Sequence, residues 1–111
     1  MPDVRSNKGI KLTTSTATVL YTVPSTYRGE VSVIAVVNTS LSAATITLDW
    51  TDNSNSDTVY TLMKEKSIPG KGNMYLELDL TLMEADTLRG TANMANVFEI
   101  TLNLQEEYFQ R

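Results

Sequence analysis

The residue types that most enzymes use for proton transfer and nucleophilic attack are largely missing from this sequence. Its 111 residues contain no histidine and no cysteine. The commonest general base, the thiol nucleophiles and the usual ligands of transition metals are therefore absent. Without cysteine, the chain also has neither a disulfide framework nor a thiolate metal site. Any remaining chemistry has to come from carboxylates.

Two pairs of carboxylates lie close enough in sequence to be considered as an acid and a base. Glu84 and Asp86 form one pair, and Asp49 and Asp52 form the other. Alternate residues of a strand point to the same face, which brings such a pair together but is equally typical of a solvated face. No sequence feature indicates a pocket or a perturbed pKa around them. We therefore expect solvated carboxylates and a protein that is not an enzyme.

Hard oxygen ligands are concentrated in one polar segment. Its members are Asp49, Asp52, Asn53, Asn55 and Asp57. Carboxylate and amide oxygens suit Ca²⁺, but the segment lacks the loop glycine and the distal bidentate glutamate of the EF-hand. Asn, Asp and Ser also bond their own backbone in turns. We expect a hairpin tip here, with no metal and no cofactor.

Aromatic and methionine side chains are the other candidates for binding. Trp50 shares a strand face with Ile46 and Leu48, so we expect it in the core rather than stacked on a sugar. Tyr75 lies opposite a stripe of leucines and is the more exposed candidate, either for a sugar or for a neighbouring subunit. Met94 lies in a polar segment, where its flexible side chain would suit an adaptable contact.

The charge balance argues against nucleic acid as a partner. Nine basic and thirteen acidic residues give a net charge of −4, which repels a phosphate backbone. The basic residues closest in sequence, Lys64, Lys66 and Lys71, are interrupted by Glu65. We expect them in a solvated segment that discourages pairing between sheet edges; contact with an acidic partner is the alternative.

Neither a membrane span nor an export signal is expected. No run approaches the roughly 18 apolar residues that a spanning helix needs. Residues 1–9 are polar apart from Val4 and lack the apolar stretch of a signal peptide. We read residues 1–9 as a flexible arm that precedes a single soluble domain.

The composition favours strands. Sixteen threonines, nine valines, five isoleucines and five tyrosines have branched or aromatic side chains that suit a pleated surface. Short runs of these residues alternate with clusters of turn residues, which is typical of a sandwich or barrel. About eight strands are expected. They cover residues 10–14, 17–23, 30–38, 44–50, 58–64, 74–80, 87–92 and 97–104.

Hydrophobic alternation indicates how these strands are buried. Residues 44–50, 74–80 and 97–104 alternate apolar and polar side chains at period two, as half-buried strands do. Residues 30–38 are apolar on both faces in their second half, which predicts a central strand. The expected fold is an all-β antiparallel sandwich, immunoglobulin-like or jelly-roll-like, over residues 10–104, followed by a tail at 105–111.

Three segments carry a resemblance to a known group of proteins. In residues 16–40 a strand reaches Tyr-Thr-Val-Pro, turns, and continues as a long apolar strand that ends in Asn-Thr-Ser; the hairpin at 44–62 and the segment at 80–106 follow. Together they resemble small β-sandwich proteins of tailed bacteriophage particles, which serve as decoration, tail or fibre-associated proteins. Ala85 departs from the pattern, which has glycine there.

The resemblance implies a structural protein of the virion, made in the host cytoplasm, that binds other virion proteins and its own copies. A head decoration or cement protein is the first expectation; a tail, connector or fibre-associated protein is the alternative. A carbohydrate- or receptor-binding module is the alternative of another class. The exposed apolar side chains are the expected assembly contacts. They are Val4, Tyr75, Met94, Tyr108 and Phe109.

Overall fold

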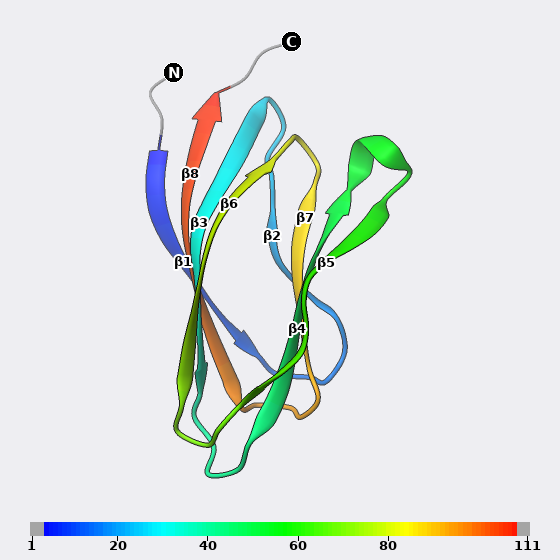
Figure 1. Ribbon diagram of the computed structural model, residues 1–111. Helices are drawn as coiled ribbons and strands as arrows, with labels where there is room; N and C mark the ends of the chain where they lie inside the picture. The colour runs from blue at the N-terminus through cyan, green and yellow to red at the C-terminus, as the bar shows by residue number, and fades with distance from the viewer. Residues whose placement is uncertain (1–3, 109–111) are drawn as a thin grey trace.

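The computed structural model describes residues 4–108, which form eight strands and one short 3-10 turn (Figure 1). The strands are β1 (Val4–Leu12), β2 (Thr18–Thr22), β3 (Tyr27–Asn38), β4 (Ala44–Asp52), β5 (Thr58–Ile68), β6 (Asn73–Leu82), β7 (Thr87–Ala92) and β8 (Phe98–Tyr108). The 3-10 turn, η1 (Asn53–Asn55), lies in the β4–β5 connection. Among the described residues, no helix is long and apolar enough to cross a membrane.

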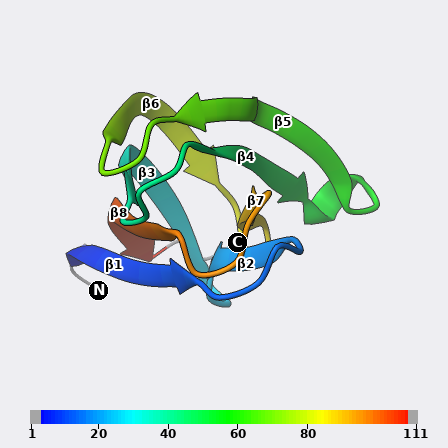
Figure 2. The ribbon, with the colours of Figure 1, turned by 90° about the horizontal axis from the view of Figure 1, so that it is seen from below.

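The strands form two four-stranded antiparallel sheets that pack face to face (Figure 2). The first sheet has the order β1-β8-β3-β6, and the second has the order β2-β7-β4-β5. Successive strands therefore lie in opposite sheets almost throughout the chain, and the first strand pairs with the last. Two interlocked Greek keys of this kind define a jelly roll. The expected antiparallel sandwich is confirmed, and the strand order decides between the two alternatives.

The core lies between the sheets, where inward-facing side chains of both layers meet. Its largest fully buried members include Phe98, Leu12, Leu20, Ile34, Ile46 and Leu48. Strand β8 alternates buried and exposed side chains over Phe98–Leu104, as the period-two pattern predicts. The two faces of the sandwich are thus set by alternation in the sequence.

Strand β3 is central, as expected, and its ladders contain an irregularity that the sequence does not indicate. The pairing of β3 with β6 and with β8 shifts between Val31 and Val33. Val31 is buried before this irregularity, and Ile34 and Val36 are buried after it. An extra residue changes the phase of side chains along a strand. The inward face therefore changes phase at Ser32, and after this point Val33, Ala35 and Val37 form an apolar outward face beside the buried Ile34 and Val36.

Both ends of the domain differ from the expectation. Residues 4–9, expected in a flexible arm, belong to β1 and pair with β8 from Val4 opposite Glu106 onward. Residues 105–108, expected in a tail, continue β8, where Glu107 lies opposite Arg28 of β3. The side chains of residues 5–9 are exposed. The alternation of apolar and polar residues that marks a half-buried strand is therefore absent from this part of the sequence. Residues 1–3 and 109–111 lie outside the described residues.

Candidate assembly surface

The first pair of carboxylates, Glu84 and Asp86, was expected to be solvated, but both side chains accept hydrogen bonds in the structure. Asp86 is buried, and its carboxylate accepts hydrogen bonds from the backbone N–H groups of Asn53 (2.8 Å) and Met83 (2.9 Å). It therefore joins the β6–β7 connection to the end of β4. The hydroxyl of Ser25 donates to Glu84 at 3.2 Å on the exposed surface. The pair acts as a structural tie between loops rather than as an acid and a base aimed at a substrate.

The second pair is divided in the same way. Asp49 is buried and binds the Arg89 guanidinium across the β4–β7 ladder, with Nε to Oδ1 at 2.8 Å. Asp52 accepts a hydrogen bond from Ser54 at 2.8 Å, at the start of the 3-10 turn. Asp49 was expected to be solvated, but Arg89 stands directly opposite it and compensates its burial. Arg89 gave no signal in the sequence, because a cross-strand partner is far away along the chain.

The polar segment proposed for Ca²⁺ folds as the tip of the β4–β5 hairpin. Its side chains bond within the tip: the Asn53 amide donates to Asp57 at 3.1 Å, and the Thr58 hydroxyl donates to the Asn55 carbonyl oxygen. Within residues 4–108, no group of three or more acidic side chains is arranged to hold a metal ion. Turn residues that bond locally account for this segment.

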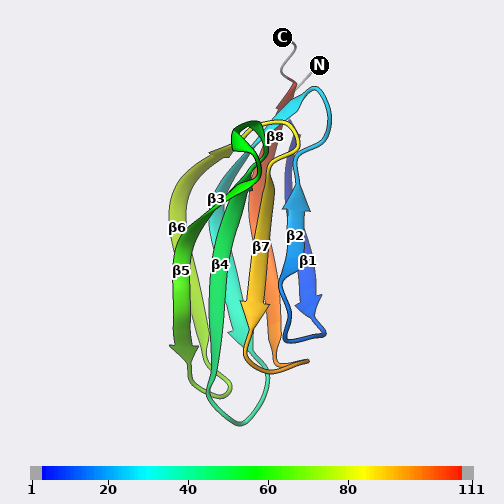
Figure 3. The ribbon, with the colours of Figure 1, turned by 90° about the vertical axis from the view of Figure 1, so that its right-hand side faces the viewer.

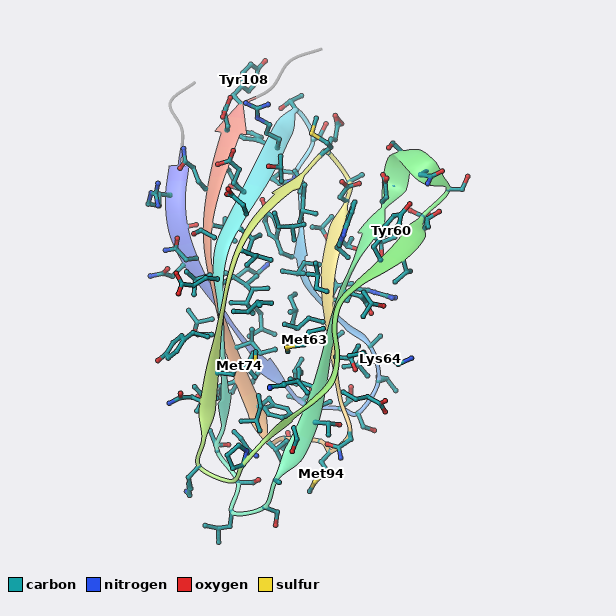
Figure 4. All side chains as sticks on the ribbon, in the orientation of Figure 1. Tyr60, Met63, Lys64, Met74, Met94 and Tyr108 are labelled. Atoms are coloured by element: carbon teal, nitrogen blue, oxygen red, sulfur yellow. The ribbon has the colours of Figure 1, made fainter. Side chains whose placement is uncertain are left out.

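Trp50 packs against the core, as expected, and is only partly buried. Its ring stacks on Tyr60 of β5, with centroids 5.1 Å apart and planes at 26°. Met63 and Met74 also pack against the core, and Figure 4 shows them between the two sheets, where β5 and β6 approach each other. Met63 and Met74 therefore fill the space between the two sheets on the side formed by the edge strands β5 and β6.

The five expected assembly contacts have different environments. Tyr75 on β6 is 65% exposed, and Met94 in the β7–β8 connection is 40% exposed. Tyr108 is the last described residue of β8 and packs edge to face on Tyr27, with ring centroids 5.8 Å apart, so it is no free tail. Val4 begins β1 opposite Glu106, and Phe109 lies outside the described residues. Tyr75 and Met94 remain predicted contacts on the surface.

Tyr75 belongs to a broader outward face of the first sheet. It lies opposite Ala35 of β3 in the ladder, and Val37 of the same strand is 36% exposed. The remaining outward residues of β6 are polar or acidic, with Glu77 and Asp79 exposed. A small apolar area with an acidic border therefore lies along the β6 side of this sheet.

Another exposed apolar residue lies at the end of the molecule that carries Met94. Leu41, in the β3–β4 connection, is 86% exposed. In the sequence its one signal is a single leucine inside a turn of Asn, Thr and Ser. A large apolar side chain at a loop tip is a candidate contact for a partner.

The loop that carries Leu41 is held from beneath by Asn38. The amide of Asn38 is fully buried, and it donates to the carbonyl oxygens of Ser42 (2.9 Å) and Ile68 (3.0 Å). Its Oδ1 accepts from the backbone N–H (2.9 Å) and the hydroxyl (2.8 Å) of Ser40. All four hydrogen-bonding positions of the amide are used. The Asn-Thr-Ser that ends the apolar strand therefore fixes the conformation of the β3–β4 connection.

No protein-family model matches the sequence, and no curated protein matches it. Solved structures do resemble the fold. A chain of the capsid of Helicobacter pylori bacteriophage KHP30 has a TM-score of 0.58 at 13% identity, with 95% of this chain and 87% of that chain covered. A chain of the infectious bursal disease virus particle has a TM-score of 0.61 at 6% identity.

The likeness is one of fold. The alignment covers 94% of this chain but only 30% of the infectious bursal disease virus chain. A chain of the pilus-like Bacillus endospore appendages has a TM-score of 0.54 at 11% identity, with 97% of this chain and 89% of that chain covered. Viral capsid chains are therefore among the structural neighbours, alongside a pilus subunit. Each of these three neighbours belongs to an assembly of many subunits.

Proposed function

We propose that this chain is a structural protein of a virus particle. The observation that carries the proposal is the likeness of this jelly-roll fold to a chain of the bacteriophage KHP30 capsid, over 95% of this chain and 87% of that chain. The match extends over nearly the full length of both chains, so the likeness that supports the proposal involves the whole domain and not a fragment of it. Jelly rolls are frequent in viral capsids.

The engagement of the acidic side chains supports a structural role over catalysis. Asp86 and Asp49 stabilise loops and a strand pair, and neither points into a cavity with a base or nucleophile beside it. A hollow of about 360 Å³ between the β4–β5 and β6–β7 connections is lined by Asn53, Ser54, Met83, Glu84 and Ala85. It contains one acidic side chain and no partner for general acid–base chemistry.

Within the virion we propose a head decoration or cement protein of a tailed bacteriophage. The resemblance of residues 16–40, 44–62 and 80–106 to such proteins supports this assignment. The backbone of Ala85, which replaces the glycine of that pattern, has a φ of 71°. This is the left-handed conformation for which glycine is usually selected. The turn that the pattern implies is therefore preserved. A tail, connector or fibre-associated protein is the second assignment.

Mass spectrometry of purified particles of the source virus tests the virion role. The chain is expected among the particle proteins, and its absence from intact particles contradicts the proposal. Electron microscopy of the same particles then distinguishes the two assignments. Density for the jelly roll on the outer surface of the head supports decoration, whereas density at the neck or tail supports the second.

The exposure of Tyr75 favours one candidate from another class, a carbohydrate-binding module. An aromatic ring that is 65% exposed, beside Ala35 on the same face, provides a surface on which a sugar ring stacks. A glycan array separates the two roles. Selective glycan binding that Tyr75→Ala abolishes supports the binding module, whereas the absence of binding removes it.

A further inference from the structure

The first sheet has two edges whose backbone groups are open to a further strand. Within residues 4–108, β1 pairs only with β8, and β6 pairs only with β3. The two edges lie on opposite sides of the molecule, with β1 beside β2 and β6 beside β5 (Figure 3). An open edge is a template for pairing with another chain unless something blocks it.

The directions of the edge strands suit identical copies placed side by side. The order β1-β8-β3-β6 is antiparallel at every step, so β1 and β6 run in opposite directions. If a second copy is placed in the same orientation, its β1 meets β6 of the first copy as an antiparallel neighbour. The lengths also match, with nine residues in β1 and ten in β6. The sheet then continues from copy to copy.

The charges of the two edges are opposite. Strand β1 contains Arg5, Lys8 and Lys11 and no acidic residue, whereas β6 contains Glu77 and Asp79 and no basic residue. Arg5 and Lys11 point to the outer face of the sheet, as do Glu77 and Asp79. Pairing β6 with β6, or β1 with β1, brings like charges together, which is unfavourable. Pairing β1 with β6 brings opposite charges together.

The β5 edge of the second sheet is protected against such pairing. In β5 the pairing with β4 is irregular, and Glu65 has a φ of 49° while its N–H bonds the Thr47 hydroxyl at 2.9 Å. Lys64 and Lys66 flank it and are exposed, and Figure 4 shows Lys64 pointing away from the sheets. A bulge with lysines blocks addition of a strand. The β3–β6 ladder has one irregularity, between Val31 and Val33, but the side chains of β6 alternate without a break and β6 contains no lysine.

We propose that copies of this chain associate head to tail, with β6 of one copy pairing antiparallel with β1 of the next. The proposal rests on the proposed function for its setting in the particle. In the register that places Val4 opposite Leu80 and Lys11 opposite Asn73, Arg5 lies opposite Asp79 and Asn7 opposite Glu77. Tyr75 then lies opposite Gly9. A Cβ placed on Gly9 would meet no heavy atom within 4 Å, so the space above this glycine is open. The exposed tyrosine ring thus covers a glycine across the junction.

Reversal of charge on each edge tests the proposal. The double variants Glu77→Lys/Asp79→Lys and Arg5→Glu/Lys11→Glu carry edges of like charge, and each is expected to associate at least roughly tenfold more weakly than the wild type in analytical ultracentrifugation. An equimolar mixture of the two is expected to recover association, because each variant then meets a complementary edge. The matched control is Glu30→Lys, an exposed outward residue of the central strand β3, which is expected to associate as the wild type does.

Cysteine pairing tests the geometry, since the chain has no cysteine of its own. Mixed Asn7→Cys and Glu77→Cys chains are expected to form disulfide-linked pairs under mild oxidation, and each alone is expected to form few. Equal crosslinking of Glu77→Cys with itself overturns the head-to-tail arrangement. A wild-type chain that is monomeric at all concentrations, or association that both reversals leave unchanged, overturns the proposal. Neither result affects the virion role, which particle mass spectrometry tests separately.

Discussion

At the scale of single residues, buried polar side chains determine the shape of the loops in this jelly roll. Asn38 is the clearest case. Its side-chain amide is fully buried, donates to the carbonyl oxygens of Ser42 and Ile68, and accepts from the backbone N–H and the hydroxyl of Ser40. A buried amide with all its partners is stabilising, and a buried group that loses them is costly. The β3–β4 loop therefore depends on one side chain.

Asn38→Asp is expected to lower the free energy of unfolding by about 2–4 kcal/mol. The substitution keeps the shape but replaces the two N–H donors with a carboxylate oxygen that faces the Ser42 and Ile68 carbonyls. Urea denaturation followed by circular dichroism measures the change. Asn55→Asp, in the exposed hairpin tip, is the matched control and is expected to cost less than about 0.5 kcal/mol. Equal effects at both positions contradict the assigned role of Asn38.

Tyr21 is a buried residue whose ionisation is strongly altered by the fold. It is 4% exposed, and its hydroxyl donates to Glu106 at 2.7 Å. Burial raises the pKa of Tyr21 well above its usual range, and the hydrogen bond to Glu106 and the charge of that carboxylate add to the shift. Gly29 makes room for the ring, since a Cβ there would lie 2.6 Å from the Tyr21 hydroxyl oxygen.

The raised pKa of Tyr21 predicts a loss of stability at alkaline pH. The folded state holds the proton more tightly than the unfolded state, so this contribution is complete below the unfolded-state value of about 10 and falls as the pH rises above it. Tyr21→Phe is expected to cost about 1–2 kcal/mol at pH 7, through the lost bond to Glu106, and to flatten the decline above pH 10. Urea unfolding at pH 7 to 11 measures both. Parallel curves for the two proteins above pH 10 contradict the assignment.

At the scale of elements, alternation predicts most strands and fails where a strand has no buried face of its own. Residues 44–50 and 74–80 fall within observed strands, and the predicted segment 97–104 does so from Phe98 onward, because apolar and polar residues alternate there. In contrast, residues 5–9 have exposed side chains along an edge, so only their pairing with β8 defines them as a strand. The phase change in β3 was also missed, because a bulge depends on the neighbouring strands.

Deletion of residues 1–9 is the prediction that belongs to this scale. The deletion removes the part of β1 that pairs with residues 101–106 of β8, together with the Lys8 ammonium, which lies 5.8 Å from the centroid of the Tyr21 ring. We expect the free energy of unfolding to fall by about 1–3 kcal/mol, since several ladder hydrogen bonds are lost while the freed residues regain entropy.

Thermal and urea denaturation of a dilute sample measure this change. Deletion of residues 1–3 alone is the control, because it removes none of the pairs that begin with Val4 and Glu106. The earlier reading of residues 1–9 as a flexible arm predicts equal stability for both deletions. Removal of residues 105–111 is expected to destabilise the fold itself, because it takes away Glu106 and Glu107, which bind Tyr21 and Arg28.

At the scale of the whole molecule, the sequence indicates a sandwich but not the order of its strands. The jelly roll pairs the first strand with the last and places β3 between β6 and β8. Alternation says which face of a strand is buried and is silent about which strand lies beside it. The candidate site was predictable to the same extent: the exposure of Tyr75 follows from alternation, whereas the opposite charges of the β1 and β6 edges acquire meaning only once the strand order is known.

The pairing of β1 with β8 also predicts that the chain tolerates circular permutation. Val4 and Glu106 are direct neighbours, and both ends of the described chain lie at the same end of the sandwich (Figure 1). A permutant that joins the natural ends through a short Gly-Ser linker and opens between Asn55 and Ser56 is expected to fold with a loss of less than about 2 kcal/mol, because exposed loop tips tolerate new ends. It keeps the Asn53 N–H bond to Asp86.

A second permutant, opened between Gly70 and Lys71, provides the contrast that makes the test specific. There the Lys71 N–H bonds the Ser40 carbonyl oxygen at 2.9 Å, and a Cβ on Gly70 would lie 2.3 Å from the backbone of Leu41. New ends at this position release the loop that Asn38 holds, so this permutant is expected to be clearly less stable in urea than the first. Equal stabilities of the two permutants would contradict this role of Asn38, because the β3–β4 loop would then be held by the sheets alone.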